Sequence, residues 1–101
     1  MPAFYDVVDT LHATYRQADH WIHRGYLPVR QASPGSGNHR SITDREAKLL
    51  RLMDQLVHIG FAPARAGELA LVLEDDGHAA LGPITLDIDL AVLAPAPEEA
   101  A

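Results

Sequence analysis

Apolar residues recur at helical spacing near the start of the chain. Within residues 5–11, the side chains of Val7, Val8 and Leu11 fall on one side of a helix, because positions three and four apart in a helix share a face. This spacing predicts a first short helix over residues 5–11.

A second short helix is predicted over residues 14–24. Thr14 is a suitable N-cap, since its hydroxyl can accept a hydrogen bond from a free N–H group of the first turn. Gly25 can end the helix, because glycine readily adopts the left-handed conformation that often follows a helix. Two short helices joined by a tight turn are the outline of a helix-turn-helix. The apolar stripe of this second helix, which we expect in the core, consists of Ala18, Trp21 and Ile22.

Residues 26–42 are typical of a hairpin with a long tip. Pro28 disfavours the helical conformation in the residue before it, so residues 26–30 are expected to be extended. Residues 31–38 are rich in Ser, Pro, Gly and Asn, which favours a loop. Residues 39–42 can then return as a second short strand.

The strongest helical pattern begins at Thr43. Thr43 and Glu46 have the spacing of a capping box, in which each side chain bonds the backbone N–H of the other residue. The helix is expected to end at about Ile59, before Gly60, and Pro63 suits the first position of a fourth helix. The two apolar stripes consist of Ala47, Leu49, Leu50, Met53, Leu56 and Val57, and of Ala66, Leu69, Ala70 and Leu73.

From His78 onward, the pattern changes from helical to alternating. Apolar side chains at positions 84, 86, 88 and 90 alternate with polar ones, which predicts a half-buried strand that a shorter strand over residues 78–81 can join. The chain therefore divides into a helical domain over residues 1–76, a β extension over residues 77–93 and a tail over residues 94–101. The tail has little to bury and is expected to be disordered.

The composition restricts the class of protein. A chain of 101 residues is long enough for one domain with a modest core. It has no cysteine, so disulfides and thiolate metal or redox sites are excluded. Charged residues occur regularly and the N-terminus lacks the pattern of a signal peptide, so neither a membrane span nor export is predicted. We therefore expect a cytoplasmic protein.

The net charge of −6 argues against a nucleic-acid partner when it is taken as an average. The charge is, however, divided along the chain. Residues 1–51 carry seven cations and five anions, whereas residues 52–101 carry one cation and nine anions. The stretch from Arg16 to Arg51 has a balance of +4, and seven of the eight cations of the chain are arginines. Arginine is well suited to bidentate contacts with phosphate and guanine, so DNA binding by the first half remains open.

The order of helix, turn, helix, hairpin, long helix and helix resembles the winged helix-turn-helix of the MerR family of bacterial transcription regulators. The resemblance covers about residues 5–73. The sequence of this stretch is similar to that of short MerR-like proteins of bacteria and phages. The stretches that carry it are His12–Trp21, Arg24–Pro28, His39–Thr43 and Gly60–Phe61. It implies a winged helix-turn-helix with four helices and a wing hairpin. With the C-terminal strand or hairpin that the alternating pattern adds, the predicted fold is mainly α with small β elements.

The chain departs from the MerR pattern in two places. Asp19 stands where the family usually has an arginine, and a strand replaces the long C-terminal dimerisation helix and the effector domain. No small-molecule effector and no cofactor are therefore predicted.

The resemblance implies a sequence-specific DNA-binding transcription regulator. The helix over residues 14–24 would enter the major groove, and the wing over residues 28–42 would lie on the backbone or in the minor groove. Arginine can bind guanine and glutamine can bind adenine through two hydrogen bonds, and tyrosine can reach phosphate or a thymine methyl group. The candidate DNA-binding residues are Thr14, Tyr15, Arg16, Gln17, His20 and Arg24 in the helix, and Arg30, Ser36, Asn38, His39 and Arg40 around the wing.

Two other functions remain open. The same contacts would suit an excisionase, a phage recombination factor that bends DNA. Alternatively, the acidic second half could engage a protein, in which case the chain would not bind DNA. The strand region over residues 78–92 is a candidate homodimer interface, because its apolar face must be covered.

Neither a metal site nor an enzyme is predicted. His20 and His23 have a spacing found among metal ligands, but no further ligand completes a site. Asp87 and Asp89 are two residues apart and therefore share one face of the predicted strand. No nucleophile accompanies them, so they are expected on a solvated face.

Overall fold

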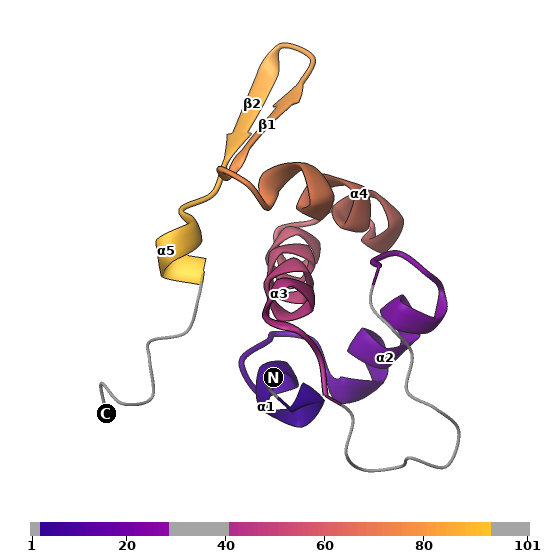
Figure 1. Cartoon of the computed structure of the whole chain (residues 1–101). Helices are drawn as coiled ribbons and strands as arrows, with labels where there is room; N and C mark the ends of the chain where they lie inside the picture. Colours follow the sequence, from indigo (N-terminus) through magenta and orange to yellow (C-terminus); the bar gives the residue numbers. More distant parts are fainter. Residues whose placement is uncertain (1–2, 29–40, 94–101) are drawn as a thin grey trace.

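The computed structural model describes residues 3–28 and 41–93. Within these ranges the chain is mainly helical with one small antiparallel hairpin, which confirms the predicted class at this level. Figure 1 shows the elements in chain order. They are α1 (Phe4–Val8), α2 (Tyr15–His23), α3 (Asp44–His58), α4 (Pro63–Leu73), β1 (His78–Leu81), β2 (Ile84–Asp87) and α5 (Leu90–Leu93).

Local side-chain chemistry fixes the helix ends much as the sequence predicts. The predicted N-caps Thr14 and Thr43 are confirmed, and each takes part in a complete capping box. In α3, the Thr43 hydroxyl accepts the Glu46 N–H at 3.0 Å, and the Glu46 carboxylate accepts the Thr43 N–H at 2.7 Å. The predicted left-handed Gly25 is also confirmed, with φ of 78°.

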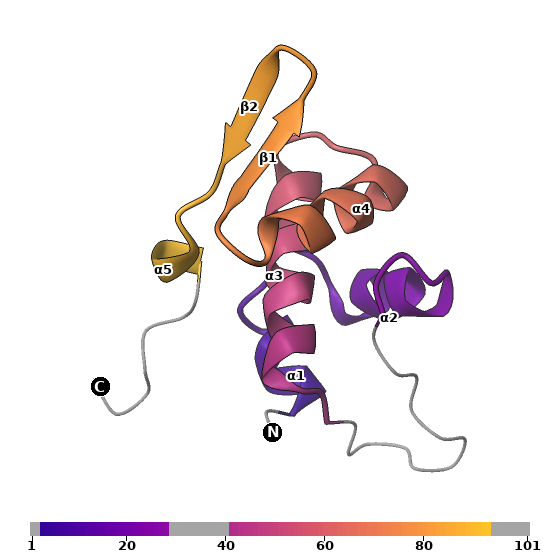
Figure 2. The same cartoon turned by 45° about the horizontal axis from the view of Figure 1, so that its top comes forward.

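The long helix α3 forms the centre of the core. In Figures 1 and 2, α4 crosses α3, while α2 lies on one side of α3 and α5 on the other. Trp21 of α2 is 4% exposed, so its predicted place in the core is confirmed. The large side chains that are fully buried include Phe4, Val7, Ile22, Ile42, Leu49, Leu50, Leu52, Met53, Leu56 and Leu73.

Two contacts set the position of α4. A Cβ atom at Gly67 would lie 2.3 Å from the backbone oxygen of Tyr26, so only glycine allows this approach. At the end of α4, Arg45 donates to both carboxylate oxygens of Glu74, at 2.7 and 2.9 Å, and Lys48 donates to the Glu74 carbonyl oxygen. These two cations offset the unfavourable carboxylate at the helix C-terminus.

Two predicted elements differ in their bounds. The first helix ends at Val8 rather than residue 11. The last strand ends at Asp87, and the chain forms α5 where the alternating pattern predicted strand up to residue 90. The reason is that Asp89 accepts the Ala91 N–H at 3.0 Å, which is the contact of a helix N-cap. The prediction of a continuous strand through Leu90 is therefore wrong.

Most of the predicted wing, residues 29–40, lies outside the described residues, as does the predicted tail over residues 94–101. At the start of the hairpin that the sequence predicts over residues 26–42, residues 26–28 form no strand. Ser41 forms an isolated antiparallel bridge with Ala3. The segment that follows the predicted wing is thus bridged to the segment that precedes α1.

In the described ranges, no helix is long and apolar enough to cross a membrane.

Candidate nucleic-acid interface

One face of α2 carries exposed cationic and polar side chains. Arg16, His20 and Arg24 are four residues apart along the helix, and all three are exposed. Their spacing places them on one face. The opposite face carries Ala18 and Trp21, which are buried in the core. The helix therefore presents a polar face to solvent, while its apolar face packs in the hydrophobic core.

The first turn of α2 is held by two of the predicted DNA-binding residues. The Thr14 hydroxyl accepts the Gln17 N–H at 3.1 Å, and Gln17 Oε1 accepts the Thr14 N–H at 2.9 Å. The Thr14 cap is predicted from the sequence, whereas the part of Gln17 in the capping box is not, although its position three residues after the cap is the signal for it. In this arrangement the Gln17 amide NH₂ group can still donate to a ligand.

Tyr15 joins α2 to α1. Its half-buried ring stacks on Tyr5 with centroids 4.8 Å apart and meets the Phe4 ring edge-on at 5.1 Å. One face of the Tyr15 ring is thus covered by Tyr5. A contact of Tyr15 with DNA stays a prediction, and these aromatic contacts assign the ring a structural part as well.

A buried carboxylate fixes the turn that precedes α2. Asp54 of α3 is 3% exposed and accepts the backbone N–H groups of His12 and Ala13, each at 2.9 Å. This role of Asp54 was not predicted from the sequence. Its signal is a lone acidic side chain beside Met53 in the apolar stripe of a helix, where a buried charge needs partners. Asp54 therefore connects the orientation of α2 to the central helix.

His12 and His58 stack on each other beside this carboxylate. Their ring centroids are 3.8 Å apart and their planes differ by 7°. Both residues are exposed, and they line a hollow of about 170 Å³ together with Gln17, Trp21 and Asp54. The hollow thus adjoins the first turn of α2.

The other cations of the first half that the structure describes, Arg45, Lys48 and Arg51, lie away from this face of α2. Arg45 is held by Glu74, and this hydrogen bond raises the pKa of Arg45 and lowers that of Glu74. Arg51 donates to the Thr10 hydroxyl at 3.2 Å, and partial burial lowers its pKa. Lys48 and Arg51 line a hollow with leucines of α5. Helix α5 lies on the side of α3 away from α2 (Figures 1 and 2). Among residues 3–28 and 41–93, the cations of the first half are therefore not gathered on one face.

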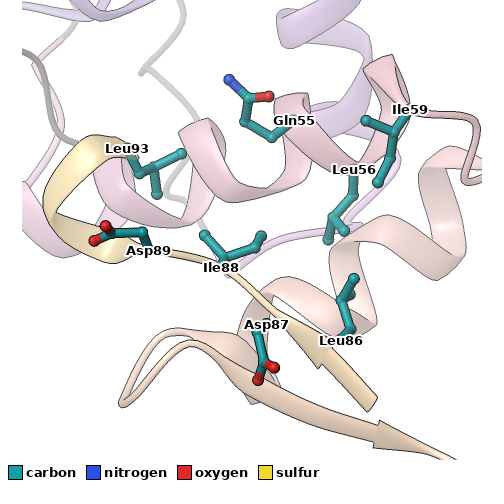
Figure 3. Close-up of a pocket in the computed structure, with 8 residues that line it drawn as sticks. All are labelled: Gln55, Leu56, Ile59, Leu86, Asp87, Ile88, Asp89 and Leu93. Carbon is teal, nitrogen blue, oxygen red and sulfur yellow. The ribbon is translucent and has the colours of Figure 1, made fainter. Parts of the chain in front are cut away.

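The end of α3 covers part of the apolar face of the C-terminal hairpin. Leu86 and Ile88 are half-buried and approach Leu56 of α3 and Ile59, the residue after α3. Together these side chains line a hollow of about 360 Å³ (Figure 3). Ile84, near the hairpin turn, is 63% exposed. The predicted homodimer contact through residues 78–92 stays a prediction, and contacts within one chain meet part of the need for cover.

Asp87 and Asp89 do not form a pair. Asp87 binds His78 across the hairpin, and this hydrogen bond raises the pKa of His78. Asp89 instead caps α5. Among the residues that the structure describes, no group of three or more His, Asp or Glu side chains could hold a metal ion.

Five of the predicted DNA-binding residues cannot be placed. Arg30, Ser36, Asn38, His39 and Arg40 all lie outside the described residues.

Comparison of the chain with models of protein families, with curated proteins and with solved structures gives no match.

Proposed function

We propose that this chain is a sequence-specific DNA-binding transcription regulator with a MerR-like winged helix-turn-helix. In this proposal α2 and its cap, residues 14–24, enter the major groove, and the wing over residues 28–42 lies on the backbone or in the minor groove. The observation that carries the proposal is the exposed row of Arg16, His20 and Arg24 on a helix whose opposite face is buried.

The two arginines lie at opposite ends of α2. Arg16 and Arg24 are eight residues apart, which corresponds to about 12 Å along a helix axis. The major groove, which is about 12 Å wide, admits the diameter of an α-helix. In this proposal Arg16, in the first turn, would reach a base edge, while Arg24, just after the last turn, would reach the phosphate backbone.

Rigidity supports the same reading, because a base-reading side chain must be held in register. The Thr14–Gln17 capping box fixes the start of α2, and Asp54 fixes the turn before it. Trp21 holds the opposite face in the core.

Selection of bound sequences from a random pool of duplex DNA tests this proposal. We expect the wild-type chain to enrich one motif. The Arg16→Ala variant should lose the preference at one base pair of that motif, because a bidentate contact with a base contributes about 1–3 kcal/mol of discrimination. The matched control is Arg65→Ala, which removes an exposed arginine of α4 that pairs with Glu68.

The outcome also separates the other functions. Enrichment of no sequence, together with no binding of duplex at low salt, would contradict the proposal and favour an acidic protein-interaction module. Binding with a large bend, measured by circular permutation of the site in a gel assay, would favour an architectural factor such as an excisionase.

A further inference from the structure

His12 and His58 stack on each other at the surface beside the first turn of α2. His12 lies in the turn before α2 and His58 is the last residue of α3. Their rings are parallel at 3.8 Å, and both residues are exposed. Stacking therefore brings two imidazole groups, each able to donate an N–H, to one point of the surface.

We infer that His12 and His58 form a binding site for one phosphate of the DNA backbone, and this inference rests on the proposed function. Protonated rings held face to face repel each other, and an anion that contacts both relieves this repulsion. Gln17 lines the same hollow. The site therefore adjoins the first turn of α2, where a phosphate would lie at the edge of the groove that Arg16 reads.

The charges around the hollow balance with one phosphate. The residues that line it come from the turn, α2 and α3, and the titratable ones are His12, Asp54 and His58. The Asp54 carboxylate is buried and its two oxygens accept the backbone N–H groups of His12 and Ala13. If both rings carry a proton when a phosphate is bound, two imidazolium charges and one carboxylate leave a single positive charge, which matches the single negative charge of a backbone phosphate.

A pH-dependent affinity for DNA follows from this site. The phosphate favours the protonated form of both rings, so binding of DNA takes up protons. By linkage, the affinity must rise as the pH falls. We expect the dissociation constant for the selected duplex to be about tenfold lower at about pH 6 than at about pH 8.

The test is fluorescence anisotropy of the labelled duplex at both pH values. His12→Gln, His58→Gln and the double variant should each lose most of the pH dependence, because one phosphate is shared by both rings. His23→Gln, which removes an exposed histidine of α2 outside the hollow, is the matched control and should keep it. His20→Gln measures the part that His20 contributes separately.

NMR of the wild-type chain gives a second readout that does not depend on the folding of a variant. The ring protons of His12 and His58 should shift when duplex is added, whereas those of His78 should not. Duplex binding with the wild-type pH dependence in the double variant would overturn this inference and leave the proposed function intact. Absence of duplex binding at low salt would overturn both.

Discussion

Replacement of Asp54 by alanine should loosen the link between α3 and the turn that precedes α2. The Asp54 carboxylate is 3% exposed and accepts two backbone N–H groups, from His12 and Ala13, at 2.9 Å each. These residues lie more than forty positions before Asp54 in the sequence, so both bonds are lost when the chain unfolds. The substitution therefore acts on the folded state.

The size of the effect follows from the two bonds. A hydrogen bond to a charged group contributes about 1.5–3 kcal/mol, so two give about 3–6 kcal/mol. Water can replace part of this, because His12 is exposed and Ala13 is only half-buried. Removal of a buried charge also recovers its desolvation cost. We expect the free energy of unfolding to fall by about 2–4 kcal/mol.

Urea unfolding followed by circular dichroism measures this change. Asp54→Asn should lose less than Asp54→Ala, since one oxygen acceptor remains. Asp75→Ala removes an exposed carboxylate after α4 and should change the stability by less than about 0.5 kcal/mol. Hydrogen exchange at the His12 and Ala13 N–H groups should accelerate in Asp54→Ala. An Asp54→Ala chain as stable as Asp75→Ala would refute the reasoning.

Two further predictions concern α4 and the hairpin. Gly67→Ala should destabilise the chain by about 1–3 kcal/mol in urea unfolding despite its better helix propensity, because the new Cβ would lie 2.3 Å from the Tyr26 oxygen; an unchanged or raised stability would contradict the close approach. The hydrogen bond with Asp87 raises the pKa of His78 above its ordinary value of 6.5. The pair therefore stabilises the hairpin fully at pH values below the pKa of His78 in the unfolded chain. This contribution is lost as the pH rises through the higher pKa of the folded chain. NMR titration of the His78 ring should show a lower midpoint in Asp87→Asn, and an identical midpoint would refute the assignment.

The parts of the fold that follow from local chemistry could be predicted from the sequence. Thr14, Gly25 and Thr43 mark helix ends because caps and left-handed glycines act on neighbouring residues. Trp21 was placed correctly because its helical spacing from the other apolar residues of α2 defines a buried face.

Features that depend on contacts between distant parts of the chain were not predicted. Asp54 binds a turn more than forty residues away, and Arg45 binds Glu74 at the far end of another helix. The described cations of the first half therefore divide between surfaces, although they are close in sequence. Asp89 fits both an alternating strand and a helix cap, and only the structure shows that its carboxylate accepts the Ala91 N–H.

The candidate interface was predicted in part. The positions of Arg16, His20 and Arg24 on the exposed face of α2 follow from the same helical spacing that buries Trp21. The stacking of His12 on His58 could not be predicted, because the two rings meet only when the turn and the end of α3 come together.

The central claim is that the exposed face of α2 binds duplex DNA, and titration of a labelled duplex that carries the selected motif tests it most directly. At low salt, the account predicts measurable binding that weakens as the salt concentration rises, since contacts with phosphate release counterions. It also predicts that Arg16→Ala binds this duplex about tenfold or more weakly, while Arg65→Ala binds as the wild type does. No binding by the wild-type chain at low salt, or equal affinities of the wild type and Arg16→Ala, would contradict the account.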